Sequence, residues 1–124
     1  TIERFPCLAL KAREVLRNLG YTNVEVIIAN GTLGYPYKAP FDGIVVTAGA
    51  PRVPLKLLEQ LAEGGRLVIP LGDRYNQMLT EVTRKEGQFI QRKIVECIFV
   101  PLIGLDAWAD IQDDGKGREY APED

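Results

Sequence analysis

The stretch VIPLGDRYNQMLTEV, residues 68–82, decides how this chain folds, because two apolar runs meet there across a short polar turn. Residues 66–71 predict a buried strand, and residues 77–84 predict a second strand. The turn between them, residues 72–76, is too short for the helix that follows a strand in most open α/β sheets. The chain therefore reverses direction, and we predict an antiparallel strand pair at this end of a sheet.

The antiparallel arrangement continues toward the carboxyl end of the chain. Residues 85–88 contain a glycine and predict a hairpin turn, and residues 89–102 predict a long strand. From Gly104 onward the sequence is polar, acidic and glycine-containing. We therefore expect residues 105–124 to form a loosely attached acidic tail, with Trp108 as the residue that would anchor it.

Before the central stretch, apolar strands alternate with helices. Pro6 suits the first turn of a helix, and the apolar residues after it recur at helical spacing. Those apolar residues are Leu8, Ala12, Val15, Leu16 and Leu19. In chain order we predict the end of a strand at residues 1–3, a helix from residues 5–6 to Gly20, a strand at 23–30, a loop at 31–40, a strand within 41–51 with a buried core at 44–46, and a helix at 53–63. This alternation predicts an α/β fold with a parallel sheet covered on both faces.

Composition limits what the chain can be. A chain of 124 residues with 46% hydrophobic and 26% charged residues suffices for one globular domain, which we assign to residues 1–104. The formal net charge of −2, with scattered lysine and arginine, argues against a nucleic-acid partner. No apolar run approaches the ~20 residues of a membrane span, and no signal-like segment opens the sequence. We expect a cytoplasmic protein that binds neither nucleic acid nor membrane.

The sequence contains no histidine and no serine. Ser-His-Asp and Cys-His catalysis and the usual histidine-containing zinc sites therefore cannot be built from this chain. Cys7 and Cys97 lie far apart in the sequence and form no C-x-x-C motif. We interpret them as two buried thiols rather than as a metal or redox pair, and we predict no metal site.

Ligands of open α/β sheets bind at the carboxyl ends of the strands, and three such ends carry candidate residues. Glu3 ends the first strand, where an acid can hold ribose hydroxyls; the alternative is a solvated glutamate beside Arg4. Asn30 ends the second strand, where its side chain could bond to an adenine edge or only form an Asn-Gly turn. The small residues at 47–51 either let ligands approach the backbone or make a tight strand-to-helix connection.

Taken in order, these stretches resemble one family, the protein-L-isoaspartate O-methyltransferases. The resemblance covers about residues 1–104, and its most specific parts are the GTLGYP loop, the TAGAP strand end and the VPL segment. The similar stretches are IER at 2–4, LGYTNVEVIIANGTLGYPYKAPFDGIVVTAGAP at 19–51, VPLKLLEQLAEGGRLVIPLG at 53–72, NQML at 76–79 and FVPLIG at 99–104. The chain looks like the carboxy-terminal portion of such an enzyme.

The resemblance implies a fold and an activity. The fold is the Rossmann-like, doubly wound sheet of S-adenosylmethionine-dependent methyltransferases, with an antiparallel strand pair at its carboxy-terminal end. The activity is methylation of the carboxylate of L-isoaspartyl residues in damaged proteins, with S-adenosylmethionine as methyl donor and no metal. A carboxylate is already a nucleophile and a sulfonium methyl group already an electrophile, so the reaction requires alignment rather than a general base. We therefore assign no catalytic residue.

The resemblance also assigns binding roles. The cofactor-binding residues would be Glu3 at the ribose, Asn30, Gly31 and Thr32 at the adenine, and Ala48; the substrate-binding residues would be Asn76, Gln77, Val100 and Pro101. The family more often has Asp in place of Asn30, and Asn keeps a carbonyl oxygen that would accept from the adenine amine. Ala48 takes a position usually filled by a small residue, and Gly49 stands where the family commonly has Ala; neither change blocks the site. For Gln77, the alternative is that it only begins a strand.

One part of the family's pattern is absent. A dinucleotide-type sheet carries its glycine-rich turn about 20 residues before the ribose acid, whereas only two residues precede Glu3. We expect either a portion of a longer methyltransferase or a remnant that acts as an interaction or oligomerisation module; the chain alone should be inactive. The missing strand would lie between the strand ending at Glu3 and the strand ending at Thr47. The sheet should therefore have a gap there, with an unpaired edge at residues 44–46 that favours self-association.

Overall fold

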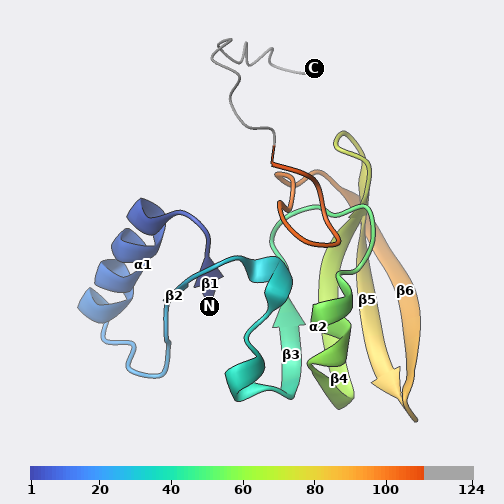
Figure 1. Ribbon diagram of the computed structural model, residues 1–124, viewed down its shortest axis with the longest axis horizontal. Coiled ribbons are helices and arrows are strands. Elements are labelled where there is room, and N and C mark those ends of the chain that lie inside the picture. The colour runs from blue at the N-terminus through green and yellow to red at the C-terminus, as the bar shows by residue number, and fades with distance from the viewer. Residues whose placement is uncertain (111–124) are drawn as a thin grey trace.

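The computed structural model describes residues 1–110, and in it the chain forms two sheets that share no strand (Figure 1). The predicted mixed α/β architecture with parallel and antiparallel pairing is confirmed. The elements are β1 (Ile2–Glu3), α1 (Pro6–Asn18), β2 (Ile27–Ile28), the 3-10 helices η1 (Gly31–Leu33) and η2 (Pro36–Lys38), β3 (Phe41–Val45), α2 (Leu55–Glu59), β4 (Leu61–Gly72), β5 (Gln77–Lys85) and β6 (Gln88–Cys97).

The larger sheet has the strand order β3-β4-β5-β6. β3 is parallel to β4, whereas β4, β5 and β6 pair antiparallel to one another. Gly72 at the end of β4 is the partner of Gln77 at the start of β5, so only residues 73–76 make the turn. The reversal predicted from residues 68–82 is confirmed.

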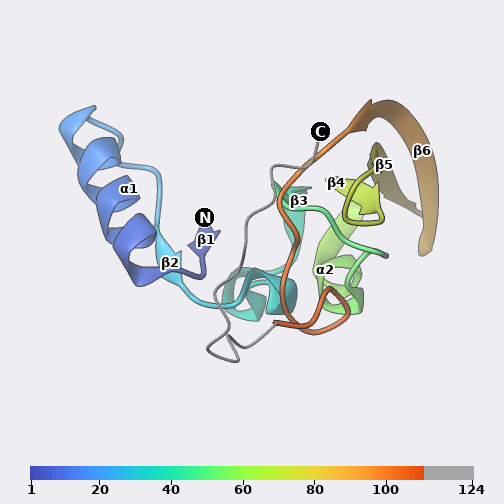
Figure 2. The ribbon, with the colours of Figure 1, turned by 90° about the horizontal axis from the view of Figure 1, so that it is seen from above.

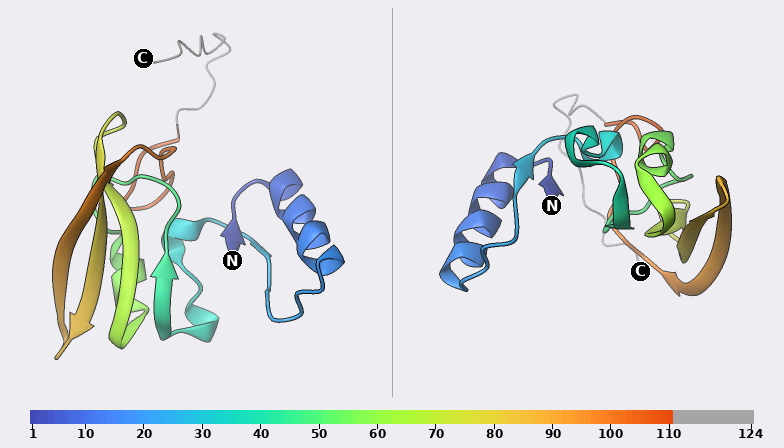
Figure 3. Two further views of the ribbon diagram at one scale, coloured as in Figure 1. Left: turned by 180° about the vertical axis from the view of Figure 1, so that it is seen from behind. Right: turned by 90° about the horizontal axis from the view of Figure 1, so that it is seen from below.

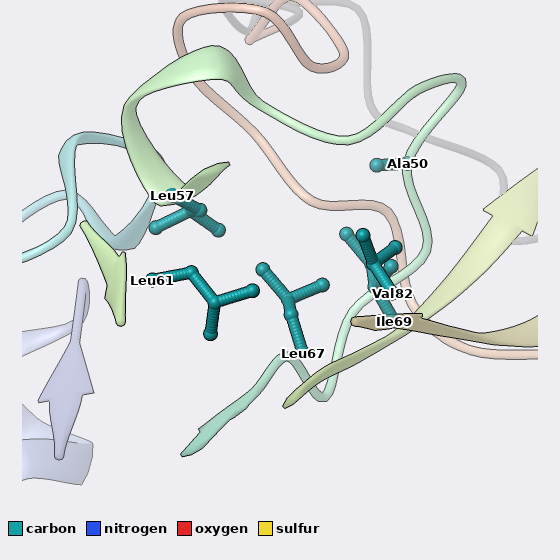
Figure 4. Packing of buried hydrophobic residues seen from close by; sticks show 6 residues of the cluster. All are labelled: Ala50, Leu57, Leu61, Leu67, Ile69 and Val82. Atoms are coloured by element: carbon teal, nitrogen blue, oxygen red, sulfur yellow. The ribbon is translucent and has the colours of Figure 1, made fainter. Parts of the chain in front are cut away.

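The hydrophobic core lies between α2 and the larger sheet (Figure 4). Its buried members are Ala50, Leu57 from α2, Leu61, Leu67 and Ile69 from β4, and Val82 from β5. Burying a side chain of this size stabilises a fold by about 1.5–3 kcal/mol relative to leaving it exposed. β4 contributes half of these residues and is therefore the central element of the folded region.

α2 is shorter than predicted, because its last residues belong to β4. The backbone N–H of Phe41 donates to the carbonyl oxygen of Gln60 (2.8 Å), and Leu61 is the pairing partner of Phe41. Pairing with β3 thus begins at Leu61, two residues after the helix ends at Glu59. The predicted helix at 53–63 is wrong at its carboxyl end, and β4 is correspondingly longer than the predicted strand at 66–71.

α2 covers only one face of β3, and this changes the burial that the sequence suggested for residues 44–46. Ile44 and Val46 pack against the core, but the side chain of Val45 is 75% exposed. Alternate residues of a strand point to opposite faces, so Val45 lies on the face that α2 does not cover. The prediction of a continuously buried strand is wrong for Val45.

The smaller sheet pairs β1 with β2 in parallel, and α1 lies beside it, apart from the larger sheet (Figures 2 and 3). Within α1 only Ala9 is buried, while Leu8, Val15 and Leu19 are exposed. Two strands of two residues each are too small to cover a helix of 13 residues. The predicted apolar face of α1 therefore exists in the sequence but is largely uncovered.

β1 is the strand of the smaller sheet nearer to β3 in Figures 1 and 2, yet the two strands do not pair. The gap predicted between the strand that ends at Glu3 and the strand that leads to Thr47 is confirmed. β2 is also shorter than the predicted strand at 23–30, since it has β1 as its only partner strand among residues 1–110.

β6 ends at Cys97, five residues before the predicted limit at Leu102. Residues 98–110 then cross the edge at which the parallel strands end (Figure 2), and we call this segment the strap. Gly104 donates its N–H to the carbonyl oxygen of Trp108 (3.0 Å), and Trp108 donates to that of Leu102 (2.9 Å). Within the predicted tail, Ala107 and Trp108 are thus held by backbone bonds, and residues 111–124 lie outside the described residues. No helix within residues 1–110 is long and apolar enough to cross a membrane.

Candidate functional site

The strap connects the predicted site residues at the ends of three strands. At the end of β3, Gly49 donates its N–H to Val100 (2.7 Å) and accepts from Leu102 (2.8 Å). Beyond these bonds the strap reaches η1 and the beginning of α2, as Figure 2 shows in orange to red. At its far end Asp110 pairs with Arg4, next to Glu3. One segment therefore spans the carboxyl edge of both sheets.

Glu3 is held by the first turn of α1. Its Oε1 accepts a hydrogen bond from the backbone N–H of Phe5 (3.0 Å). Within residues 1–110 the other carboxylate oxygen makes no hydrogen bond, and the side chain is partly exposed. A fixed carboxylate with one free oxygen at a strand end is an arrangement that can accept from a sugar hydroxyl.

Asn30 forms the turn that begins η1. Its Oδ1 accepts from the backbone N–H of Thr32 (3.0 Å) and from the Thr32 hydroxyl (2.8 Å), and Thr32 is fully buried. Both lone pairs of the amide oxygen are therefore used inside the protein. The expectation that this oxygen would accept from an adenine amine does not fit the geometry, and only Nδ2 remains for a ligand.

The strap packs directly on this turn at Gly104. A Cβ atom at Gly104 would lie 2.4 Å from Oγ1 of Thr32 and 2.6 Å from Nδ2 of Asn30. Asp106 further fixes the strap, because its carboxylate accepts from the N–H of Leu55 (3.3 Å) at the start of α2. The predicted adenine side of the site therefore lies against the strap.

A cavity of about 600 Å³ lies beside Asn30 and is mostly apolar. Its lining residues are Ile27, Ala29, Asn30, Leu33, Gly34, Tyr35, Pro36, Tyr37, Lys56, Glu59 and Gln60. The rings of Tyr35 and Tyr37 are 5.4 Å apart. Gly31 and Thr32 do not line this cavity, and neither Glu3 nor Ala48 borders it. Of the predicted cofactor-binding residues, Asn30 alone lines this cavity.

Gln60, which the sequence interpretation missed, fixes the loop that lines this cavity. Its side chain is 6% exposed; Nε2 donates to the carbonyl oxygen of Leu33 (3.0 Å), and Oε1 accepts from the N–H of Tyr35 (2.8 Å). Gly34 between them has φ +63°, and a Cβ there would lie 2.1 Å from Oε1 of Gln60. In the sequence, only Gly34 of the GTLGYP loop indicated that another group packs closely against this backbone.

Two of the four predicted substrate-binding residues come together at a second cavity, of about 580 Å³. Asn76 and Gln77 line it together with Leu71, Met78, Glu96, Cys97 and Ile98. Val100 and Pro101 lie in the strap, where Val100 is 69% exposed and Pro101 is the bridge partner of Gly49. The structure therefore does not place all four residues on one wall.

The turn before Gln77 is closed by a carboxylate. Oδ1 of Asp73 accepts from the backbone N–H groups of Tyr75 and Asn76, at 2.7 Å each. These two bonds hold the pKa of Asp73 below its ordinary value, the bond from Tyr75 contributing most. Arg74 of the same turn lies over the ring of Trp108, 5.1 Å from its centroid, so the turn is also tied to the strap.

The cysteines differ from the prediction of two buried thiols. Cys7 is exposed and Cys97 is partly exposed. Cys7 lies in the first turn of α1, which the small sheet leaves open, and Cys97 ends an edge strand at the second cavity. Within residues 1–110 no cluster of three or more acidic or cysteine side chains could hold a metal ion.

Comparison with known proteins identifies close relatives. A protein-L-isoaspartate O-methyltransferase of Geobacter metallireducens is 52% identical over 109 residues, which cover 87% of this chain and 50% of that protein. The enzyme of the same name from Staphylothermus marinus is 52% identical over 112 residues, covering 89% of this chain and 50% of that protein. The chain spans about half the length of these curated relatives.

Two solved structures are also similar to this chain. One described as a protein-L-isoaspartate O-methyltransferase has a TM-score of 0.75 at 27% identity, over 86% of this chain and 34% of that one. Another, from Plasmodium falciparum and described as such an enzyme in complex with S-adenosyl-L-homocysteine, has a TM-score of 0.71 at 31% identity, over 82% of this chain and 50% of that one.

The resemblance read from the sequence is confirmed by these matches. The sequence profile of the family described as Protein-L-isoaspartate(D-aspartate) O-methyltransferase matches residues 1–107. The chain therefore belongs to the protein-L-isoaspartate O-methyltransferase family.

Proposed function

We propose that this chain provides the carboxyl-edge part of a protein-L-isoaspartate O-methyltransferase. The complete enzyme would methylate the carboxylate of L-isoaspartyl residues in damaged proteins. The observation that carries the proposal is Glu3, whose carboxylate is fixed at the end of β1 with one oxygen free, in a chain that matches the family over residues 1–107. S-adenosyl-L-homocysteine, bound by the Plasmodium relative, is the product of such a methyl transfer.

The residues of this chain suit a reaction that needs alignment more than acid–base chemistry. When bound, S-adenosylmethionine would supply an electrophilic methyl group. Glu3 would accept from the ribose hydroxyls, Asn30 would donate from Nδ2 to the adenine, and Ala48 would leave room beside the end of β3. Gly31 and Thr32 would border the adenine through the turn, and Val100 and Pro101 would line the path of the acceptor peptide. The lack of histidine and serine is no obstacle, because a carboxylate acceptor needs no general base.

The doubly wound sheet of the complete enzyme would require a strand between β1 and β3. β1 pairs only with β2 and β3 only with β4, so each strand has an unpaired edge within residues 1–110. The relatives are about twice as long as the matched region. We infer that a parallel strand from the unmatched half of such an enzyme joins the two sheets.

A chimera tests the proposal. The half of the Geobacter metallireducens enzyme that this chain does not match would be joined to this chain. Methyl transfer would be measured with an isoaspartyl peptide and with the same peptide carrying ordinary aspartate. We expect S-adenosylmethionine-dependent transfer to the isoaspartyl peptide alone. A folded chimera that transfers to neither peptide would contradict the proposal.

A variant of Glu3 tests the proposed role of this residue in cofactor binding. Glu3→Ala in the chimera removes charge-assisted hydrogen bonds to the ribose, each worth about 1.5–3 kcal/mol. We expect weaker binding of S-adenosylhomocysteine in calorimetry. Glu14→Ala, which removes an exposed carboxylate on α1, serves as the control and should leave binding unchanged. Equal affinities for all three proteins would remove Glu3 from the site.

A second function rests on the exposed edge of β3. An unpaired strand with an exposed apolar side chain such as Val45 is a surface on which another chain can pair. The chain would then be an interaction module without catalysis. Micromolar binding of S-adenosylhomocysteine by the chain alone would exclude this alternative, and an inactive chimera in which the chain still self-associates would favour it.

A further inference from the structure

Gln77 is a buried amide at the point where the chain reverses. Its side chain is only 4% exposed. Nε2 donates to the backbone carbonyl oxygen of Asp73 (2.8 Å), and Oε1 accepts from the backbone N–H of Phe99 (2.6 Å). The two ends of one amide are therefore bonded to two different segments, the turn at residues 73–76 and the strap.

The amide also lies on the backbone of Gly49. A Cβ atom at Gly49 would lie 2.6 Å from Cδ of Gln77 and 2.8 Å from each of its two amide heavy atoms. Gly49 itself exchanges backbone hydrogen bonds with Val100 and Leu102 of the strap. Gln77 thus joins three segments that are distant in the sequence: the end of β3, the turn and the strap.

Two of these segments, the turn and the strap, form walls of the second cavity. Asn76 lines it from the turn, and Ile98 lines it from the beginning of the strap. Gln77 stands between the two walls, with its hydrogen-bonding groups directed to protein backbone. Replacing Gln77 therefore changes the spacing of the two walls but removes no hydrogen-bonding group that was free to bind a ligand.

We propose that Gln77 is a positioning residue for the acceptor side of the site and does not itself bind the acceptor. It holds the turn at residues 73–76 and the strap at a fixed spacing on either side of the cavity where the acceptor peptide would enter. This inference rests on the proposed methyl transfer for the identity of the acceptor. The spacing itself is a property of the chain that can be measured without any activity.

The first experiment measures amide hydrogen exchange by NMR in the chimera. Gln77→Ala removes both bonds, so exchange should accelerate at the Phe99 amide and at the amides of Tyr75 and Asn76. Gln77→Glu keeps an oxygen that accepts from Phe99 but cannot donate to Asp73, since a carboxylate has no N–H. We expect it to retain protection at Phe99 and to lose protection in the turn.

The pair of variants makes the inference falsifiable. The prediction is overturned if Gln77→Ala leaves exchange at Phe99 unchanged, or if Gln77→Glu loosens Phe99 as much as Gln77→Ala does. Because exchange is measured without substrate, an inactive chimera would count against the proposed function and leave this result standing. If Gln77→Ala does not fold, Gln77→Glu alone still distinguishes the two ends of the amide.

The second experiment separates positioning from direct contact in an active chimera. Gln77→Ala should raise KM for the isoaspartyl peptide about tenfold, the change that corresponds to about 1.4 kcal/mol. The Kd for S-adenosylhomocysteine should change less than twofold. An effect of the same size on both constants would overturn the assignment to the acceptor side.

A double-mutant cycle with Phe99 tests whether Gln77 acts through its hydrogen bond with the Phe99 backbone N–H. Phe99→Pro removes the N–H that Gln77 accepts from, and Phe99→Ala is the control that keeps it. If Gln77 acts through this bond, Phe99→Pro should raise KM in the parent and add little in the Gln77→Ala background. Additive effects on KM would show that Gln77 meets the acceptor directly, and would overturn the inference.

Discussion

At the scale of single residues, glycines and side-chain amides occur in contacting pairs. In each pair the amide occupies the space where a Cβ atom on the glycine would lie. The pairs are Gly34 with Gln60, Gly49 with Gln77, and Gly104 with Asn30. These glycines belong to the GTLGYP, TAGAP and FVPLIG stretches that carry the family resemblance. In this chain a side chain at any of the three glycines would therefore require the paired amide to move.

Gly34→Ala tests this at the most crowded position. Gly34 and Gly20 both have positive φ, +63° and +84°, but nothing lies within 4 Å of a Cβ at Gly20. Gly20→Ala, the control, should lower the free energy of unfolding by about 1–2 kcal/mol through backbone strain alone. Gly34→Ala also displaces the Gln60 amide, whose two hydrogen bonds contribute about 1 kcal/mol each.

We expect Gly34→Ala to cost about 1–2 kcal/mol more than Gly20→Ala in urea unfolding, because of those two bonds. The difference between the two variants contains those two bonds together with the additional strain at Gly34, whose φ of +63° and ψ of −149° lie in a region essentially restricted to glycine. Equal losses would mean that the Gln60 amide moves aside without cost.

At the scale of elements, the turn between β4 and β5 has its own stabilising group. Asp73 accepts two backbone hydrogen bonds, and its pKa is lowered by them, most by the bond from Tyr75. A lowered folded pKa means that the carboxylate form stabilises the turn. That contribution is fully present above the ordinary aspartate pKa of about 3.9 and is lost as pH falls through the lower folded value.

This predicts an acid-dependent loosening of the turn. An NMR titration of the Asp73 carboxyl should give a pKa below the ordinary value, and exchange at the Asn76 amide should accelerate over the same pH range. Asp73→Asn is the control, since its side chain does not titrate and the pH dependence at Asn76 should disappear. A carboxyl that titrates at or above the ordinary value would contradict the prediction.

At the scale of the whole molecule, the two sheets leave edges that no strand within residues 1–110 pairs with. β3 ends the larger sheet on the side of β1, and Val45 on it is exposed. β6 ends the same sheet on the other side and exposes Phe89, Ile90, Ile94 and Val95. Unpaired apolar edges favour pairing with another chain, which a charge on the edge strand opposes.

We therefore expect the chain alone to form a dimer or larger oligomer in light scattering. Val45→Lys should shift it toward monomer, because the charge lies beside the unpaired edge of β3. Ile90→Lys places the same charge on β6 and should have less effect. A parent chain that is monomeric, or an oligomer that only Ile90→Lys dissociates, would contradict the assignment of the contact to β3.

The chain reversal at residues 73–76 and the helix behind Pro6 could be predicted from the sequence, because both depend on residues close together in the chain. The gap between β1 and β3 was also predictable, since it follows from the order of the strands in the family's sheet. Element ends were less predictable. Leu61 reads as part of a helix, yet its pairing with Phe41, twenty residues away, places it in β4.

What the sequence by itself determined is the alternation of strands and helices, the reversal and the family. Only the tertiary structure decided which groups are available to a ligand. The sequence predicted that Gln77 binds the substrate, but its amide oxygen accepts from Phe99. It also predicted that Asn30 accepts from the adenine, but its amide oxygen accepts from Thr32, and both residues pack against Gly104. The physical reason is that a hydrogen-bonding group can serve a ligand only with the capacity its own fold leaves unused. Phe99 lies 22 residues from Gln77, so that bond depends on the tertiary structure, whereas Thr32 lies only two residues from Asn30, in the turn that the sequence offered as one of two alternatives.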